Sequence, residues 1–104
     1  MPTRRRLTAR VRRAVRFLRR HFPLRTPLTV RVVDQPGLHG TAHYGGDRCL
    51  IRLSPDSDTV MIDSLVEEYS HLARAECPVP IVDDHDALFW AIYGAISLKM
   101  RGET

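Results

Sequence analysis

The 104-residue sequence has few of the features that mark specialised classes of protein. Its two cysteines, Cys49 and Cys77, are too few for a disulfide framework, and we expect both to be reduced. No apolar run approaches the roughly 20 residues of a membrane-spanning helix, and no signal-peptide segment opens the chain. The glycine and serine patterns of nucleotide-binding folds and serine hydrolases are also missing. We therefore expect a cytoplasmic protein with no membrane span.

Length and composition predict a single small domain. A chain of 104 residues suits one hydrophobic core, and 43% apolar with 27% charged residues is ordinary for a globular protein. The chain has no internal repeat, low-complexity tract or linker. We expect residues 1–104 to form one domain.

Basic residues are concentrated near the start of the chain. The formal net charge is +4, and ten of the 16 basic residues lie before position 26, all of them Arg. The first acidic residue is Asp34. Because Lys99 is the single Lys of the sequence, part of this excess reflects a general preference for Arg.

Within the basic segment, apolar residues recur at helical spacing and predict a helix over about residues 5–22. The apolar positions are Leu7, Val11, Ala14, Val15, Leu18 and Phe22. The opposite arc of this helix gathers Arg12, Arg13, Arg16, Arg19 and Arg20. Such a face suits nucleic acid or another polyanion. Two alternatives stay open: the face is simply solvated, or the segment is a transit peptide, against which its low serine content argues.

Three strands are predicted between residues 28 and 53. Residues 28–33 alternate and are rich in β-branched side chains. Residues 41–44 and 48–53 flank Gly45-Gly46-Asp47, a typical hairpin turn. We expect these strands to form a small sheet.

Two helices are predicted after the strands. A polar turn offers several N-caps for a helix over about residues 59–74, which ends before Pro78. Asp83 or Asp84 is expected to cap a last helix over about residues 84–100. The element order predicts an α+β domain with an N-terminal helix, a three-stranded, mostly antiparallel sheet and two C-terminal helices.

The candidate site is the sequence Glu67-Glu68-Tyr69-Ser70-His71 in the first of these two helices. Residues four apart lie on one face of a helix, so Glu67 and His71 project together. The pattern differs by one residue from H-E-x-x-H, in which two His bind zinc and the Glu acts as base. Here Glu67 occupies the first ligand position.

The last predicted helix adds to this pattern. Residues 84–93 read Asp-His-Asp-Ala-Leu-Phe-Trp-Ala-Ile-Tyr. With the upstream motif they resemble small phage and bacterial SprT-like metallopeptidases of the zincin type, which carry D-H-x-x-x-[FW]-x-x-x-Y after the active-site helix. The resemblance covers roughly residues 60–97 by motif, and the preceding strands by element order only.

The resemblance implies a metal-dependent peptidase that acts on a peptide or protein substrate, near nucleic acid if the basic helix binds it. Carried over by position, it implies that Glu67, His71 and His85 bind a divalent metal, zinc before others, and that Glu68 activates water. Tyr93 would stabilise an oxyanion or pack. Glu67 departs from the family pattern, because a carboxylate ligand leaves zinc less positive than an imidazole does and its bound water less acidic.

The spacing of the aromatic residues near His85 predicts which side chains face the protein interior. His85 is expected to begin a stripe with Phe89 and Ile96 that faces the protein interior. Trp90 falls off this stripe and is expected at a partly exposed rim.

Alternatives to a metal site stay open. Glu67 and His71 also fit an ordinary i,i+4 surface pair, because they lie opposite the apolar arc of their helix. In that case the domain is a catalytically inactive zincin-like scaffold that binds nucleic acid or an acidic protein through its Arg face, or a purely structural accessory protein. Cys77 is a weaker ligand candidate. His39 and His43 flank the first hairpin strand, where a zincin would align its substrate by β-augmentation.

Overall fold

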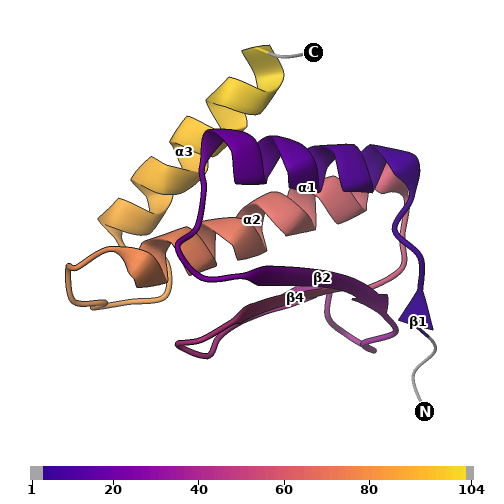
Figure 1. Cartoon of the computed structure of the whole chain (residues 1–104), viewed down its shortest axis with the longest axis horizontal. Helices are drawn as coiled ribbons and strands as arrows, with labels where there is room; N and C mark the ends of the chain where they lie inside the picture. Colours follow the sequence, from indigo (N-terminus) through magenta and orange to yellow (C-terminus); the bar gives the residue numbers. More distant parts are fainter. Residues whose placement is uncertain (1–3, 103–104) are drawn as a thin grey trace.

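In the computed structural model, which describes residues 4–102, α1 and α2 lie on the same face of one sheet (Figure 1). The elements in chain order are β1 (Arg4–Arg5), α1 (Ala9–His21), β2 (Leu28–Val33), β3 (Gly40–Tyr44), β4 (Cys49–Leu53), α2 (Asp58–Glu76) and α3 (Ala87–Gly102). The predicted α+β class, with an N-terminal helix, a small sheet and two C-terminal helices, is confirmed.

Side-chain caps fix where the first two long helices begin. The Thr8 hydroxyl accepts a hydrogen bond from the N–H of Val11 at 3.3 Å, so α1 begins at Ala9 and the expected start near residue 5 is wrong. Ser57 does the same for α2 through the N–H of Val60, also at 3.3 Å. Each helix therefore starts where a hydroxyl satisfies a free N–H group.

The expected start of the last helix is also wrong. The carboxylate of Asp86 caps α3 by accepting a hydrogen bond from the N–H of Phe89 at 2.9 Å. Arg74 holds this carboxylate in place through a second hydrogen bond. Asp83 and Asp84 lie in the preceding loop, where Asp83 accepts from the N–H of His85 at 3.1 Å. His85 is exposed and precedes the helix, so it does not begin an inward-facing stripe.

The sheet has the strand order β1-β2-β4-β3. The hairpin is antiparallel as predicted, with Ala42 opposite Ile51, and β1 pairs antiparallel with β2. β2 pairs parallel with β4, so that Val30 also lies beside Ile51. The sequence does not predict β1, because Arg5 falls within the predicted basic helix and Arg4 directly precedes it. Two of the three pairings among the described residues are antiparallel, and β3 lies at an edge of the sheet.

The core lies between the sheet and the helices. Alternate residues of β4 are fully buried, namely Cys49, Ile51 and Leu53. The predicted apolar arcs of the helices cover them, and their buried residues include Val11, Val15, Leu18, Met61, Leu65, Tyr69 and Leu72. The Tyr69 hydroxyl donates to the Leu18 carbonyl at 3.2 Å, which joins α2 to the last turn of α1. This packing fixes the orientation of α2, on which Glu67 is exposed and Glu68 and His71 are half-buried.

Both cysteines are free thiols. Cys49 is fully buried in β4, and burial, followed by the nearby Glu76 carboxylate, raises the pKa of its thiol. Cys77 directly follows α2 and is half-buried. Within residues 4–102, no helix is long and apolar enough to cross a membrane.

Candidate metal centre

Three side chains with metal-binding atoms converge beside the C-terminal half of α2. One ligand atom each from Glu67, His71 and His85 lies within 4.8 Å of the others. α2 supplies the first two, one turn apart, and the loop before α3 supplies His85. The structure therefore brings together the three residues that the sequence singled out, and the cluster can hold a metal ion.

The separations in this cluster fit a small cation after a modest adjustment. Two ligand atoms each about 2.1 Å from a tetrahedral ion lie roughly 3.4 Å apart. Separations of up to 4.8 Å leave at most about 1.4 Å to close. Glu67 and His85 are exposed, so their side chains have room to rotate. Two imidazoles and one carboxylate suit zinc, and also iron(II) or manganese.

An aromatic platform holds the two imidazoles beside each other. The His71 ring stacks on Phe89 with centroids 4.4 Å apart, and the His85 ring meets Phe89 edge-on at 4.7 Å. The two imidazole centroids are 4.9 Å apart. Phe89 is fully buried and therefore fixed, whereas Trp90, 5.6 Å from His85, is 55% exposed. The expected position of Trp90 at a partly exposed rim is confirmed.

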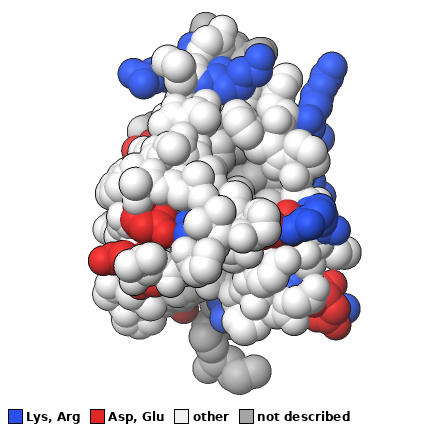
Figure 2. Space-filling model, turned by 90° about the vertical axis from the view of Figure 1, so that its left-hand side faces the viewer, with Lys and Arg blue, Asp and Glu red and all other residues white. Residues whose placement is uncertain are grey.

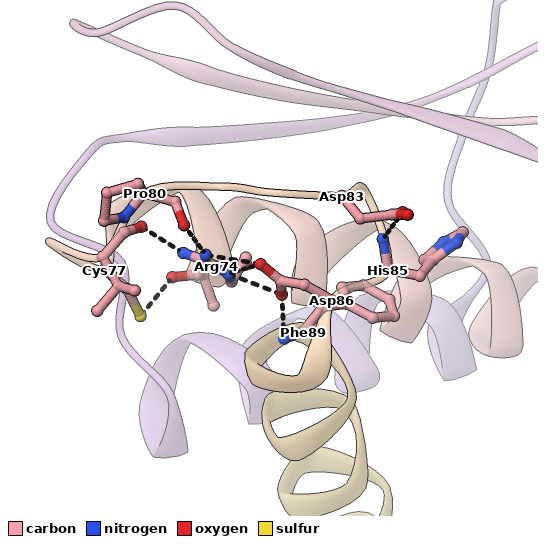
Figure 3. Close-up of polar contacts among 9 residues, drawn as sticks. Arg74, Cys77, Pro80, Asp83, His85, Asp86 and Phe89 are labelled. Atoms are coloured by element: carbon pink, nitrogen blue, oxygen red, sulfur yellow. Dashed lines mark hydrogen bonds and ion pairs between the residues drawn. The ribbon is translucent and has the colours of Figure 1, made fainter.

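A buried arginine fastens the loop that carries His85 onto α2 (Figure 3). The Arg74 guanidinium donates to the Asp86 carboxylate at 2.7 to 3.1 Å. It also donates to the carbonyls of Val79 at 2.9 Å and Pro80 at 2.8 Å. The hydrogen bond from Arg74, followed by the one from the N–H of Phe89, lowers the pKa of Asp86 to about 2. Both ends of the loop are thereby tied to one side chain.

Sequence reasoning singled out neither Arg74 nor Asp86. Arg74 is 2% exposed although it stands near the end of a helix, where a basic residue is usually solvated. The available signal was the position of Asp86 directly before the aromatic run of α3, where an acidic residue caps a helix.

Glu68 lies beside the cluster in a poorly solvated position. Burial, then the charge of Glu67, raises its pKa from 4.5 to about 7, and His85 opposes this shift. The Glu68 side chain packs against the start of β3, where a Cβ added at Gly40 would lie 3.3 Å from its Cγ. Burial, followed by the charge of His85, lowers the pKa of His71, which favours the neutral imidazole that binds metals.

The other candidate residues lie outside the cluster. The Tyr93 ring is half-buried, 6.0 Å from Phe89 and 5.6 Å from Trp90, and these contacts favour packing over an oxyanion role. The Cys77 thiol lies 3.5 Å from a carbonyl of α2. His39 and His43 are exposed on and before β3.

The predicted basic face is present on α1. Its five arginines are all exposed, and they are Arg12, Arg13, Arg16, Arg19 and Arg20. Arg19 also donates to the carbonyl of Leu28, so one of them supports the start of β2. Binding of nucleic acid to this face stays a prediction.

No protein-family model, curated protein or solved structure matches the chain. The resemblance to SprT-like zincins therefore rests on the motifs of residues 60–97. Clusters of acidic and imidazole side chains also occur on protein surfaces without a metal. Around this cluster, buried Phe89 contacts both imidazole rings, and the bond between Arg74 and Asp86 holds the loop that carries His85.

Proposed function

We propose that the protein is a metal-dependent peptidase in which Glu67, His71 and His85 hold a divalent cation, zinc before others. The observation that carries the proposal is the convergence of three ligand atoms within 4.8 Å, from α2 and from a loop fastened to it. Three protein ligands leave a coordination position open, as catalytic zinc sites do. When bound, the cation supplies Lewis acidity for hydrolysis of a peptide bond.

In this proposal Glu68 is the general base. It directly follows a proposed ligand in the chain, and in the metal-free protein burial and the charge of Glu67 raise its pKa to about 7. Its carboxylate takes a proton from the attacking water and passes it to the leaving amine. With a cation beside it, the pKa of Glu68 lies lower, because a positive charge favours the carboxylate form.

An extended peptide is the substrate class that the sheet favours. β3 lies at an edge, so the outer side of its backbone is open to pairing with another strand. Gly40, the first residue of β3, lies against Glu68. A peptide that pairs with β3 therefore passes close to the proposed base.

Elemental analysis of protein purified without a metal-affinity tag tests the metal site. We expect about one metal per chain after dialysis against zinc and then buffer, and loss of that metal in His71→Ala and His85→Ala. His39→Ala is the matched control, because His39 is exposed and outside the cluster. Folded wild-type protein that retains no metal would contradict the proposal.

A second measurement separates metal binding from hydrolysis. Glu68→Gln is expected to keep the metal and to lose zinc-dependent cleavage of a fluorogenic peptide by at least about a hundredfold. If Glu68→Gln cleaves as well as the wild type, the metal site stands and the assigned base is wrong. If neither protein cleaves any peptide, the domain is a metal-binding scaffold.

A second candidate function is nucleic-acid binding through α1. The exposed arginines of its outer face favour this function. Binding of a duplex oligonucleotide should weaken with salt and be lost when Arg12, Arg13, Arg16 and Arg20 are neutralised. Tight binding that is independent of salt would contradict it.

A further inference from the structure

A groove of about 580 Å³ lies between α1, α2 and α3, and none of the residues that line it belongs to the metal cluster. Ligand pockets commonly have volumes of about 300–1,000 Å³. The apolar part of the lining comes from all three helices and includes Phe17, Ile62, Val66, Tyr93 and Met100. Most of these side chains are only half-buried, so a partner that covered them would remove further apolar surface from water.

The rim of the groove is mainly basic. Of the described residues that line it, Arg10, Arg13 and Arg101 are basic and Asp63 is acidic. Arg10, Arg13 and Phe17 are spaced three and four apart, so two arginines and an aromatic ring share one side of α1. Figure 2 shows Arg and Lys side chains at the top and along the right-hand side of the molecule, with uncharged surface between them.

We propose that this groove binds an acidic amphipathic helix of another protein. Apolar side chains at successive turns of that helix enter the groove and pack on Phe17, Tyr93 and Met100. Carboxylates on its flanks meet Arg10 and Arg13. The site requires no metal, so it stands or falls independently of the peptidase proposal.

The lining favours such a peptide over nucleic acid. Interfaces with nucleic acid are polar and depend on phosphate contacts, which an apolar groove floor does not provide. Phosphates would also engage Arg12 and Arg16 of α1, which do not line the groove. A peptide that occupies the groove depends on Arg10 and Arg13 in particular. Charge reversal at Arg10 and Arg13, compared with charge reversal at Arg12 and Arg16, therefore distinguishes a bound peptide from bound nucleic acid.

Fluorescence anisotropy with labelled helical peptides tests the proposal. The probes are Glu-rich peptides of about 18 residues with Leu, Phe or Trp on one face, each paired with a scrambled version of the same composition. In about 0.15 M salt, we expect at least one peptide to bind at least about tenfold more tightly than its scrambled version. Amide shifts in NMR spectra of the labelled protein should fall on the groove-lining residues of α1 and α3.

Matched variants locate the binding site. The double variant Arg10→Glu/Arg13→Glu should lower the affinity for the peptide at least about tenfold. The double variant Arg12→Glu/Arg16→Glu changes the charge equally and should lower the affinity less than about threefold. Ser97→Trp, which fills the groove without changing charge, should weaken binding like the first pair. Melting curves confirm that each variant is folded.

Four results would overturn the proposal. In the first, no peptide binds better than its scrambled version. In the second, both double variants weaken the peptide equally. In the third, the protein binds a DNA oligonucleotide more tightly than every peptide, and the two double variants weaken this binding equally. That result would assign the surface to nucleic acid. In the fourth, a concentration-dependent dimer is lost in the Arg10 and Arg13 variant, which assigns the groove to a second copy of the chain.

Discussion

The Arg74 guanidinium donates a 2.7 Å hydrogen bond to the carboxylate of Asp86, the residue that directly follows His85. The same guanidinium holds two carbonyls of the loop, and the same carboxylate caps α3. One buried cation thus joins α2, the loop and α3. His85, the third candidate ligand, directly precedes the carboxylate that this bond holds.

Asp86→Asn should weaken zinc binding about tenfold, because loss of a group that orients a ligand typically costs 10- to 100-fold in affinity. The amide no longer pairs with the Arg74 charge, and His85 becomes less well placed. Isothermal titration with zinc measures the change. Asp47→Asn in the exposed hairpin turn is the control and should bind zinc as the wild type does. Equal affinities for both variants would show that the bond does not position His85.

Asp86 should also contribute to stability in a defined range of pH. Its pKa is lowered from 3.8 to about 2, first by the hydrogen bond from Arg74. The unfolded chain therefore binds the proton more readily than the folded protein, so this stabilisation is complete above pH 4 to 5 and is lost toward pH 2. The difference in Tm between the wild type and Asp86→Asn should be constant from pH 7 to about 5 and then narrow. A constant difference down to pH 2 would contradict the assignment.

Glu68→Gln should stabilise the metal-free protein at alkaline pH. The pKa of Glu68 is raised to about 7, so its ionisation is less favourable in the folded than in the unfolded state. A shift of this size corresponds to at most about 3 kcal/mol, and solvent screening of a partly exposed group reduces the expected gain to about 1–2 kcal/mol. Urea titrations in the presence of a chelator should show this gain above pH 8 and no difference near pH 4. The same gain at both values would point to a cause other than charge.

Glu67→His should make the proposed centre more active. It replaces a charged ligand by a neutral imidazole, which leaves the cation more positive and the attacking water more acidic. The pH at which cleavage is half-maximal should fall by about one unit, whereas Glu67→Ala should lose metal. Metal content and pH profiles of both variants provide the measurement. Identical behaviour of the two variants would show that residue 67 is not a ligand.

Gly94→Ala should stabilise the protein by about 0.5–1 kcal/mol, because alanine favours the helix interior. A Cβ at this position of α3 meets no atom within 4 Å. Gly46 also has free space around it, but its φ of +84° disfavours any side chain, so Gly46→Ala should destabilise the fold. Urea unfolding of both variants separates helix propensity from backbone strain. Destabilisation by Gly94→Ala would mean that α3 has a partner at this face.

Features within one element followed from the sequence. The four-residue spacing placed Glu67 and His71 on one face of α2, and the hairpin followed from its glycine turn. The sequence alone did not determine where α3 begins, because Asp83, Asp84 and Asp86 are all suitable N-caps. Tertiary contact with α2 decides among them, and helical periodicity carries no information about that contact.

Contacts between elements that are far apart in the chain were not predicted from the sequence. The parallel pairing of β2 with β4 joins two strands that are separated in the chain by β3, and no local pattern encodes it. The raised pKa of Glu68 results first from burial and then from the charge of Glu67, and the start of β3 at Gly40 lies against its side chain. The motif therefore identified the candidate ligands, but not the groups that tune and orient them.

The unequal burial of the two thiols has a practical consequence. Cys49 is sealed between β2 and the helices, whereas Cys77 is partly open to solvent at the start of the loop that carries His85. A maleimide dye or spin label will therefore attach at Cys77 in preference to Cys49. The native chain thus provides its own attachment point for a spectroscopic reporter, at the start of the loop that carries the candidate ligand His85.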